Sequence, residues 1–149
     1  MLNLIDFLMS PTFERKQNEL KALFAACPNE ESKYKKIMEM GRTLTKLEMH
    51  LKTPENIVKG CQSVMYLHSF LKEGNVYFKV ESEALISAGL AALLIYVYNG
   101  ETPESILTCA PTFLEELGIR ASLTPSRANG LYSVHLRMKQ DALRLLTAK

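Results

Sequence analysis

The chain has 149 residues, of which 47% are apolar and 23% are charged, and its formal net charge at pH 7 is +2. This length predicts one globular domain, residues 1–149, whose core can be stable without disulfides or a structural metal. The nearly balanced charge, with no long run of one sign, argues against a nucleic-acid or membrane-surface partner.

Cysteine usage and the N-terminal segment indicate the compartment. The three cysteines, Cys27, Cys61 and Cys109, are scattered and odd in number, which is typical of a reducing environment. Residues 1–9 are apolar, but they carry Asp6 and lack the basic start of a targeting peptide, so we expect them to pack onto the domain. The sequence therefore predicts a cytoplasmic protein.

Two helices are predicted near the N-terminus. Pro11 follows Ser10 as a first-turn proline follows a helix cap, and apolar residues then recur at spacings of three and four up to Cys27. Asn29 is a suitable cap for a second helix, and Gly41 is a suitable stop. We expect these two helices to pair as a helical hairpin.

The middle of the chain has the composition of β-strands. β-Branched and aromatic residues dominate 57–58, 64–71 and 76–80, and Gly74 lies in a short turn between the last two segments. Apolar residues alternate along 76–80, which leaves one apolar face to be covered. The pattern predicts a three-stranded antiparallel sheet with helices on one side.

Helices are predicted again after the sheet. Ser82 is a suitable cap for an apolar helix over 83–98, which we interpret as a buried central helix because it is short for a membrane span and contains polar residues. A short helix ends before Pro111, another covers 112–117, and a last helix opens at 123–127. The predicted fold class is therefore α+β, with helices packed against an antiparallel sheet.

Cys61 is the first candidate functional residue, because it lies on a predicted loop between two strands. Gly60 lets the backbone turn beside the sulfur, and Lys59 is close enough in sequence to favour the thiolate, which is the nucleophilic form. An inert, partly buried cysteine is an equally good interpretation of these residues alone. Cys27 and Cys109 lie on or beside apolar helix faces, where we expect them to be packing residues.

Arg127 is the second candidate. A cation in the first turn of a helix opposes the helix dipole, which suggests that an anion such as a thiolate or persulfide is held there by the guanidinium and the free backbone N–H groups. The alternative, an exposed surface arginine, is favoured when the residues are considered alone.

No other chemistry is indicated by the sequence. His50, His68 and His135 are far apart, and none pairs with a cysteine at metal-ligand spacing, so we expect structural histidines and no zinc site. A glycine-rich phosphate loop, a nucleophile elbow and a metalloprotease motif are all absent from the sequence. Hydrolysis and phosphoryl transfer therefore have no recognisable machinery.

A family resemblance is carried by three segments: GCQS at 60–63, SEA at 82–84 and LTPSRANGL at 123–131. Together they resemble the SufE family, whose members are sulfur-accepting accessory proteins of cysteine desulfurases in iron–sulfur cluster biogenesis. The resemblance extends from about residue 34 to residue 146. Two tryptophans that are common in the family are missing, and Tyr66 stands in place of one of them.

The resemblance implies a fold shared with IscU-type scaffolds and a sulfur-accepting role for Cys61. The matching cysteine takes sulfane sulfur from the persulfide of a SufS-like cysteine desulfurase, an enzyme that uses pyridoxal phosphate, and so stimulates that enzyme. The sulfur then passes to a downstream iron–sulfur scaffold. The acceptor needs no metal or organic cofactor, and it is a sulfurtransferase-type accessory protein rather than a stand-alone enzyme.

The resemblance also implies supporting residues. Because the family shelters its cysteine in an apolar cavity and moves it outward on docking, we expect Gly60 to be a hinge and Gln62 a loop neighbour. Arg127 matches an arginine that organises the loop or the partner interface, and Glu83 matches an acidic position near the loop.

Several alternatives stay open. The chain can be a monomer or a homodimer. It can be an iron–sulfur cluster or metal scaffold of related fold, which requires three converging ligands, or a docking module in which Cys61 is dispensable.

Overall fold

The computed structural model describes residues 10–148, so the expected packing of residues 1–9 lies outside the described residues. The elements in chain order are α2 (Pro11–Ala25), α3 (Glu30–Arg42), the 3-10 turns η1 (Met49–Leu51) and η2 (Pro54–Asn56), β1 (Met65–Lys72), β2 (Asn75–Ser82), α4 (Leu85–Tyr98), α5 (Pro103–Thr108), α6 (Phe113–Glu116), the 3-10 turn η3 (Arg120–Ser122) and α7 (Pro125–Thr147). Among these helices none is long and apolar enough to cross a membrane.

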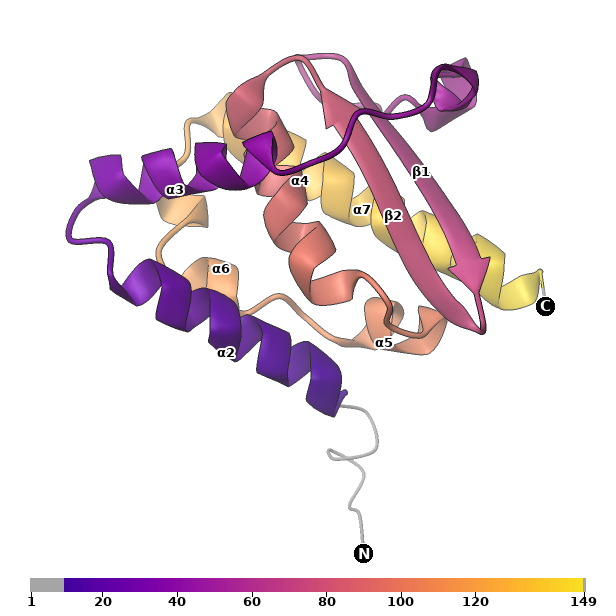
Figure 1. Ribbon diagram of the computed structural model, residues 1–149, viewed down its shortest axis with the longest axis horizontal. Helices are drawn as coiled ribbons and strands as arrows, with labels where there is room; N and C mark the ends of the chain where they lie inside the picture. Colours follow the sequence, from indigo (N-terminus) through magenta and orange to yellow (C-terminus); the bar gives the residue numbers. More distant parts are fainter. Residues whose placement is uncertain (1–9, 149) are drawn as a thin grey trace, which may run out of the picture.

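The sheet is an antiparallel hairpin of β1 and β2, with Leu67 opposite Val80. Helices α4 and α7 cover one of its faces (Figure 1), and the residues directed toward them, such as Leu67 and Val76, are buried. The α+β prediction is confirmed, but the expected third strand over 57–58 is wrong. Ile57 makes only an isolated bridge to Tyr66. Its carbonyl accepts a hydrogen bond from the Arg137 side chain at 3.1 Å instead of continuing a strand ladder.

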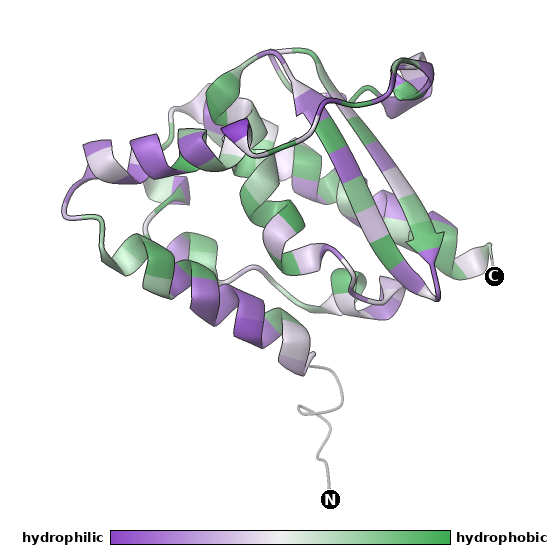
Figure 2. Ribbon diagram, viewed as in Figure 1, coloured by the Kyte–Doolittle hydropathy of each residue, from purple (hydrophilic) through white to green (hydrophobic). Residues whose placement is uncertain are grey.

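Helix α4 is the central element, as its apolar sequence predicts. It packs against α2, α3, α7 and β2, and hydrophobic residues cover most of its length (Figure 2). The helix begins at Leu85 instead of residue 83, with Ala84 at the cap position and no side-chain cap. The Ser82 hydroxyl accepts a hydrogen bond from the Ala84 N–H at 3.3 Å, so this serine stabilises the bend before the helix and not its first turn.

Helices α3 and α4 cross at two glycines. A Cβ atom on Gly41 would lie 2.8 Å from the Gly89 nitrogen, and one on Gly89 would lie 2.1 Å from the Ile37 carbonyl oxygen. Gly41 therefore does not stop α3, which continues to Arg42, but permits close backbone contact. Helix α2 also packs on α4, so both N-terminal helices are arranged around α4 (Figure 1) and the expected hairpin packing is minor.

Two cysteines and a histidine belong to the core and its edge. Cys109 is buried, as predicted, and Cys27 packs at the edge of the core. The Tyr98 hydroxyl donates to the Cys109 carbonyl at 2.5 Å and lies 3.2 Å from Nε2 of His135. Burial lowers the pKa of His135 to about 4, so this histidine is neutral at pH 7. It packs against Tyr98 at the edge of the core, as expected of a structural histidine.

Candidate functional site

Cys61 lies on the loop between η2 and β1, and Gly60 determines the path of that loop. Gly60 has a φ of +95°, a conformation that residues with a Cβ atom rarely adopt. A Cβ atom at this position would also lie 2.3 Å from the Ser133 hydroxyl on α7. The loop therefore packs closely on α7, and its backbone angle favours glycine at position 60.

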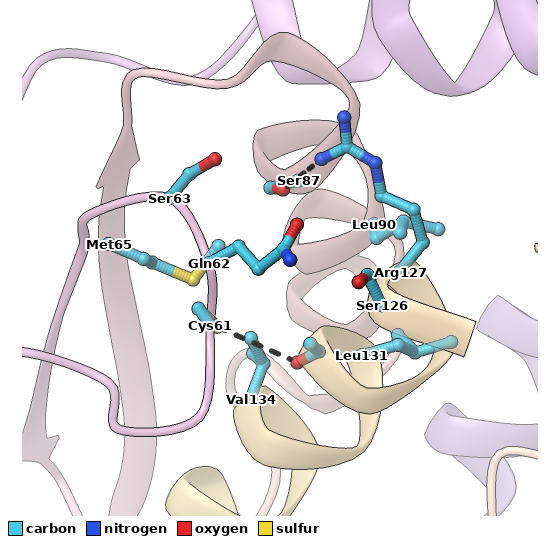
Figure 3. Close-up of a pocket in the computed structure, with 11 residues that line it drawn as sticks. Cys61, Gln62, Ser63, Met65, Ser87, Leu90, Ser126, Arg127, Leu131 and Val134 are labelled. Atoms are coloured by element: carbon cyan, nitrogen blue, oxygen red, sulfur yellow. Dashed lines mark hydrogen bonds between the residues drawn. The ribbon is translucent and has the colours of Figure 1, made fainter. Parts of the chain in front are cut away.

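The loop closes a small cavity beside the cysteine. Its volume is about 20 Å³, which is enough for about one water-sized atom. The lining comes from the loop, the first residue of β1, α4 and α7 (Figure 3), and it consists of Cys61, Gln62, Ser63, Met65, Ser87, Leu90, Ser126, Arg127, Gly130, Leu131 and Val134.

The Cys61 side chain is half-buried, and its thiol donates a weak hydrogen bond to the Gly130 carbonyl at 3.8 Å. Burial raises the pKa of Cys61, because desolvation disfavours the thiolate. The expectation that Lys59 favours the thiolate is therefore wrong for this conformation. The Lys59 side chain is exposed and lines a different groove, together with Pro54 and Arg137.

Arg127 lines the same cavity, so the structure brings together the two candidates that are 66 positions apart in the sequence. Its backbone N–H is capped by the Thr124 hydroxyl at 3.3 Å, and its Nη1 donates to the Ser87 hydroxyl on α4 at 2.9 Å. Among residues 10–148, no carboxylate lies within ion-pair distance of this guanidinium. Arg127 is therefore a half-buried cation with a neutral partner.

The remaining predicted residues divide into two groups. Gln62 lines the cavity, although its side chain is largely exposed, and Gly60 adjoins it. Glu83 is exposed in the bend between β2 and α4 and does not line the cavity. Sequence reasoning missed Ser87, whose one signal was a hydroxyl in the first turn of an otherwise apolar helix.

A network centred on Arg137, also missed from the sequence, holds the start of the loop. Arg137 donates to the carbonyls of Glu55 at 2.7 Å and Ile57 at 3.1 Å, and to the Asp141 carboxylate at 3.0 Å. The buried Asp141 also accepts from the Ser69 hydroxyl at 2.6 Å. These bonds join η2 and Ile57 to α7 and β1, so the segment before Gly60 is anchored by side-chain hydrogen bonds.

No group of three or more His, Cys, Asp or Glu side chains within the described residues is placed to hold a metal ion. The cluster-scaffold alternative therefore lacks a recognisable ligand set in residues 10–148.

Comparison with known proteins agrees with this site. The family model of SufE, described as the Fe-S metabolism associated domain, matches residues 18–142, which include the Cys61 loop and most of α7. The chain belongs to the SufE family. This membership confirms the resemblance and supports a role in iron–sulfur metabolism.

Individual relatives of this SufE-family chain are longer. It is 37% identical over 131 residues to SufE-like protein 1, chloroplastic/mitochondrial, of Arabidopsis thaliana, a match that covers 87% of the chain and 35% of the relative. It is 38% identical over 111 residues to an uncharacterized SufE-like protein of Synechocystis, with coverage of 74% and 70%. The chain thus spans about a third of the length of the plant relative.

The fold also occurs in a solved structure. The solution structure of a hypothetical protein from Thermus thermophilus matches with a TM-score of 0.73 and 22% identity, and the match covers 93% of this chain and 98% of the other. At this identity the match supports the α+β fold alone.

Proposed function

We propose that this SufE-family chain is a sulfur acceptor and carrier in which Cys61 takes sulfane sulfur from the persulfide of a cysteine desulfurase. The observation that carries the proposal is the position of Cys61. It follows Gly60, which has a positive φ, on a loop beside a cavity that holds about one atom. Membership in a family associated with iron–sulfur metabolism supports it.

The proposed transfer is an exchange between sulfur atoms without net oxidation. The Cys61 thiolate attacks the terminal sulfur of the desulfurase persulfide, a new S–S bond forms on Cys61, and the desulfurase cysteine leaves as a thiolate. Because this step regenerates the free cysteine of the desulfurase, it stimulates turnover of that enzyme. The chain acts as a transferase component and has no complete reaction of its own.

The resting geometry favours a thiol, so the transfer requires the loop to move. Burial raises the pKa of Cys61, whereas the nucleophile is the thiolate. Docking of the desulfurase exposes the sulfur to water and to the partner, which removes the desolvation that favours the thiol. Gly60 is suited to be the hinge, since Arg137 anchors the segment before it.

The cavity is suited to protect the product. Leu90, Leu131 and Val134 give it apolar walls, which limit access of water and thiol reductants to a persulfide that has returned with the loop. Arg127 supplies a positive charge for a persulfide anion in the same cavity. The sulfur then passes to an iron–sulfur scaffold.

The proposal includes partners and a location. The desulfurase is expected to supply pyridoxal phosphate, and the acceptor uses no cofactor of its own. A cytoplasmic, reducing location fits three free cysteines, and the proposed partners include neither nucleic acid nor a membrane. Light scattering distinguishes the monomer from the homodimer.

Intact-protein mass spectrometry tests the proposal directly. The chain is incubated with a cysteine desulfurase, pyridoxal phosphate and cysteine, and Cys61→Ser and Cys27→Ser are compared with the wild type. We expect a gain of about 32 Da per sulfur atom that a reductant reverses, that persists in Cys27→Ser and that is lost in Cys61→Ser. A wild type that gains no sulfur from two different working desulfurases would contradict the acceptor function.

A further inference from the structure

The partner of Arg127 is unusual for an arginine at the edge of a core. Arg120 and Arg137 bond to the carboxylates of Glu115 and Asp141. The Arg127 guanidinium instead donates to the neutral Ser87 hydroxyl, and it is directed toward α4 and away from Cys61 (Figure 3). Within the described part of the chain, this bond is the one that orients the guanidinium.

The position of this guanidinium decides the charge around Cys61. Of the described side chains that line the cavity, Arg127 is the only charged one. Those from the loop, from β1 and from α4 are neutral, and the charge of Lys59 lies in the neighbouring groove. No other described side chain that lines the cavity carries a positive charge that could pair with an anionic sulfur.

We propose that Ser87 is a positioning residue that holds the Arg127 guanidinium away from the Cys61 sulfur in the resting protein. A guanidinium next to the sulfur would favour the thiolate. The hydrogen bond from Arg127 to Ser87 on α4 keeps the guanidinium away, so that Cys61 stays a thiol and donates to the Gly130 carbonyl. Unproductive reaction of Cys61 with stray electrophiles is thereby slowed before the desulfurase docks.

After sulfur transfer, the Arg127 guanidinium can exchange its hydrogen bond to Ser87 for one to the Cys61 persulfide. A persulfide anion on Cys61 competes with the Ser87 hydroxyl for the guanidinium, because a bond to the anion adds the attraction between opposite charges that a neutral hydroxyl cannot offer. Arg127 therefore leaves Ser87 for the sulfur only when the sulfur is negatively charged. This inference rests on the proposed acceptor function, because it assigns Ser87 a part in that site.

The pH dependence of Cys61 alkylation tests the role of Ser87 without any partner protein. The chain is treated with iodoacetamide between pH 6 and pH 10, and the tryptic peptide of residues 60–72, which contains Cys61 as its one cysteine, is quantified by mass spectrometry. For Ser87→Ala we expect a lower apparent pKa of Cys61 and an alkylation rate at pH 7 that is about three- to tenfold higher.

Three variants identify the cause of the change. Ser87→Thr keeps the hydroxyl and should restore the wild-type profile. Ser126→Ala removes a hydroxyl that lines the cavity without a bond to Arg127 within the described residues, and it should leave the profile unchanged. Ser87→Ala combined with Arg127→Gln removes the charge, so the increase should disappear.

Two results would overturn the proposal. One is an unchanged profile in a folded Ser87→Ala variant. The other is an equal increase in the combined variant, which would mean that the mutation only loosens the loop. Because these measurements need no desulfurase, their failure is distinct from failure of the proposed function, which the sulfur-transfer experiment reports independently.

Discussion

The Cys61 sulfur lies 3.8 Å from the carbonyl oxygen of Gly130 and donates its proton to it. A carbonyl oxygen accepts from a thiol but repels a thiolate, so this contact and the burial of Cys61 act in the same direction. The site holds the unreactive form of the residue that we propose to be the nucleophile. The sulfur transfer that we propose therefore requires movement of the loop.

The first prediction concerns alkaline stability. Burial raises the pKa of Cys61 above the ordinary value of 9.0, so the folded state retains the thiol proton more tightly than the unfolded state. The resulting stabilisation is present below pH 9 and is lost as the pH rises through the folded pKa. In urea unfolding between pH 7 and pH 10.5, the wild type should lose more stability than Cys61→Ser. Parallel curves for the two proteins would contradict this expectation.

The second prediction concerns Gly60. Gly60→Ala should cost about 1 to 2 kcal/mol for the left-handed backbone angle and more for the contact with Ser133. Gly74→Ala is a matched control, because Gly74 has a φ of +82° but nothing within 4 Å of an added Cβ atom. Thermal unfolding should show a larger loss for Gly60→Ala, and Ser133→Ala, which removes the hydroxyl nearest to the added Cβ atom and keeps a good helix former in α7, should recover part of the difference. Equal losses at Gly60 and Gly74 would mean that the loop does not press on α7.

The third prediction concerns the crossing of α3 and α4. Gly89→Ala should destabilise the fold by about 3 kcal/mol or more, because the added Cβ atom meets the backbone of Ile37, which cannot rotate away. Gly130→Ala, also inside a helix, meets only the Cys61 sulfur at 3.9 Å and should stabilise by up to about 1 kcal/mol through helix propensity. Chemical denaturation measures both, and the prediction fails if the two changes have the same sign.

The fourth prediction concerns acid stability. The pKa of His135 is about 4 in the folded state against an ordinary 6.5, so the unfolded state binds the proton more tightly between these values. Stability from neutral His135 is present above pH 6.5 and is lost as the pH falls toward 4, by roughly 2 to 3 kcal/mol. His135→Phe, which keeps an aromatic ring against Tyr98, should flatten this part of the profile. An unchanged slope in the variant would argue that carboxylates alone cause the loss.

The fifth prediction concerns the anchor of the loop. Arg137→Met removes the donors to Glu55, Ile57 and Asp141. The buried Asp141 carboxylate then keeps only the exposed Arg144 at 3.9 Å as a cation, and the loss of its close partner costs up to about 3 to 5 kcal/mol. Hydrogen exchange should increase in residues 55–61. Combining Arg137→Met with Asp141→Leu should recover part of the stability, since no unpaired charge remains. If exchange in the loop is unaffected, the network does not anchor it.

Local sequence signals predicted much of the fold. Caps at Ser10 and Asn29 are formed as expected, because each is a short-range contact between a side chain and a backbone N–H three residues later. The secondary-structure predictions failed where contacts with residues distant in sequence determine the local structure. The 57–58 segment has strand composition, yet the Ile57 carbonyl accepts a hydrogen bond from Arg137 on α7. Gly41 has the sequence context of a helix stop, yet it lies where α3 crosses α4 and permits close backbone contact there.

The sequence by itself determined the family, the reactive candidate Cys61 and the apolar character of the central helix, because motif spacing and hydrophobic patterning are properties of the chain. The tertiary structure decided the state of the site. Only folding places Arg127 in the Cys61 cavity, attaches its guanidinium to Ser87 and aims the Gly130 carbonyl at the sulfur. Desolvation and hydrogen-bond geometry depend on neighbours that are distant in sequence, which is why Lys59, only two positions away in the chain, has less effect on the thiol than burial does.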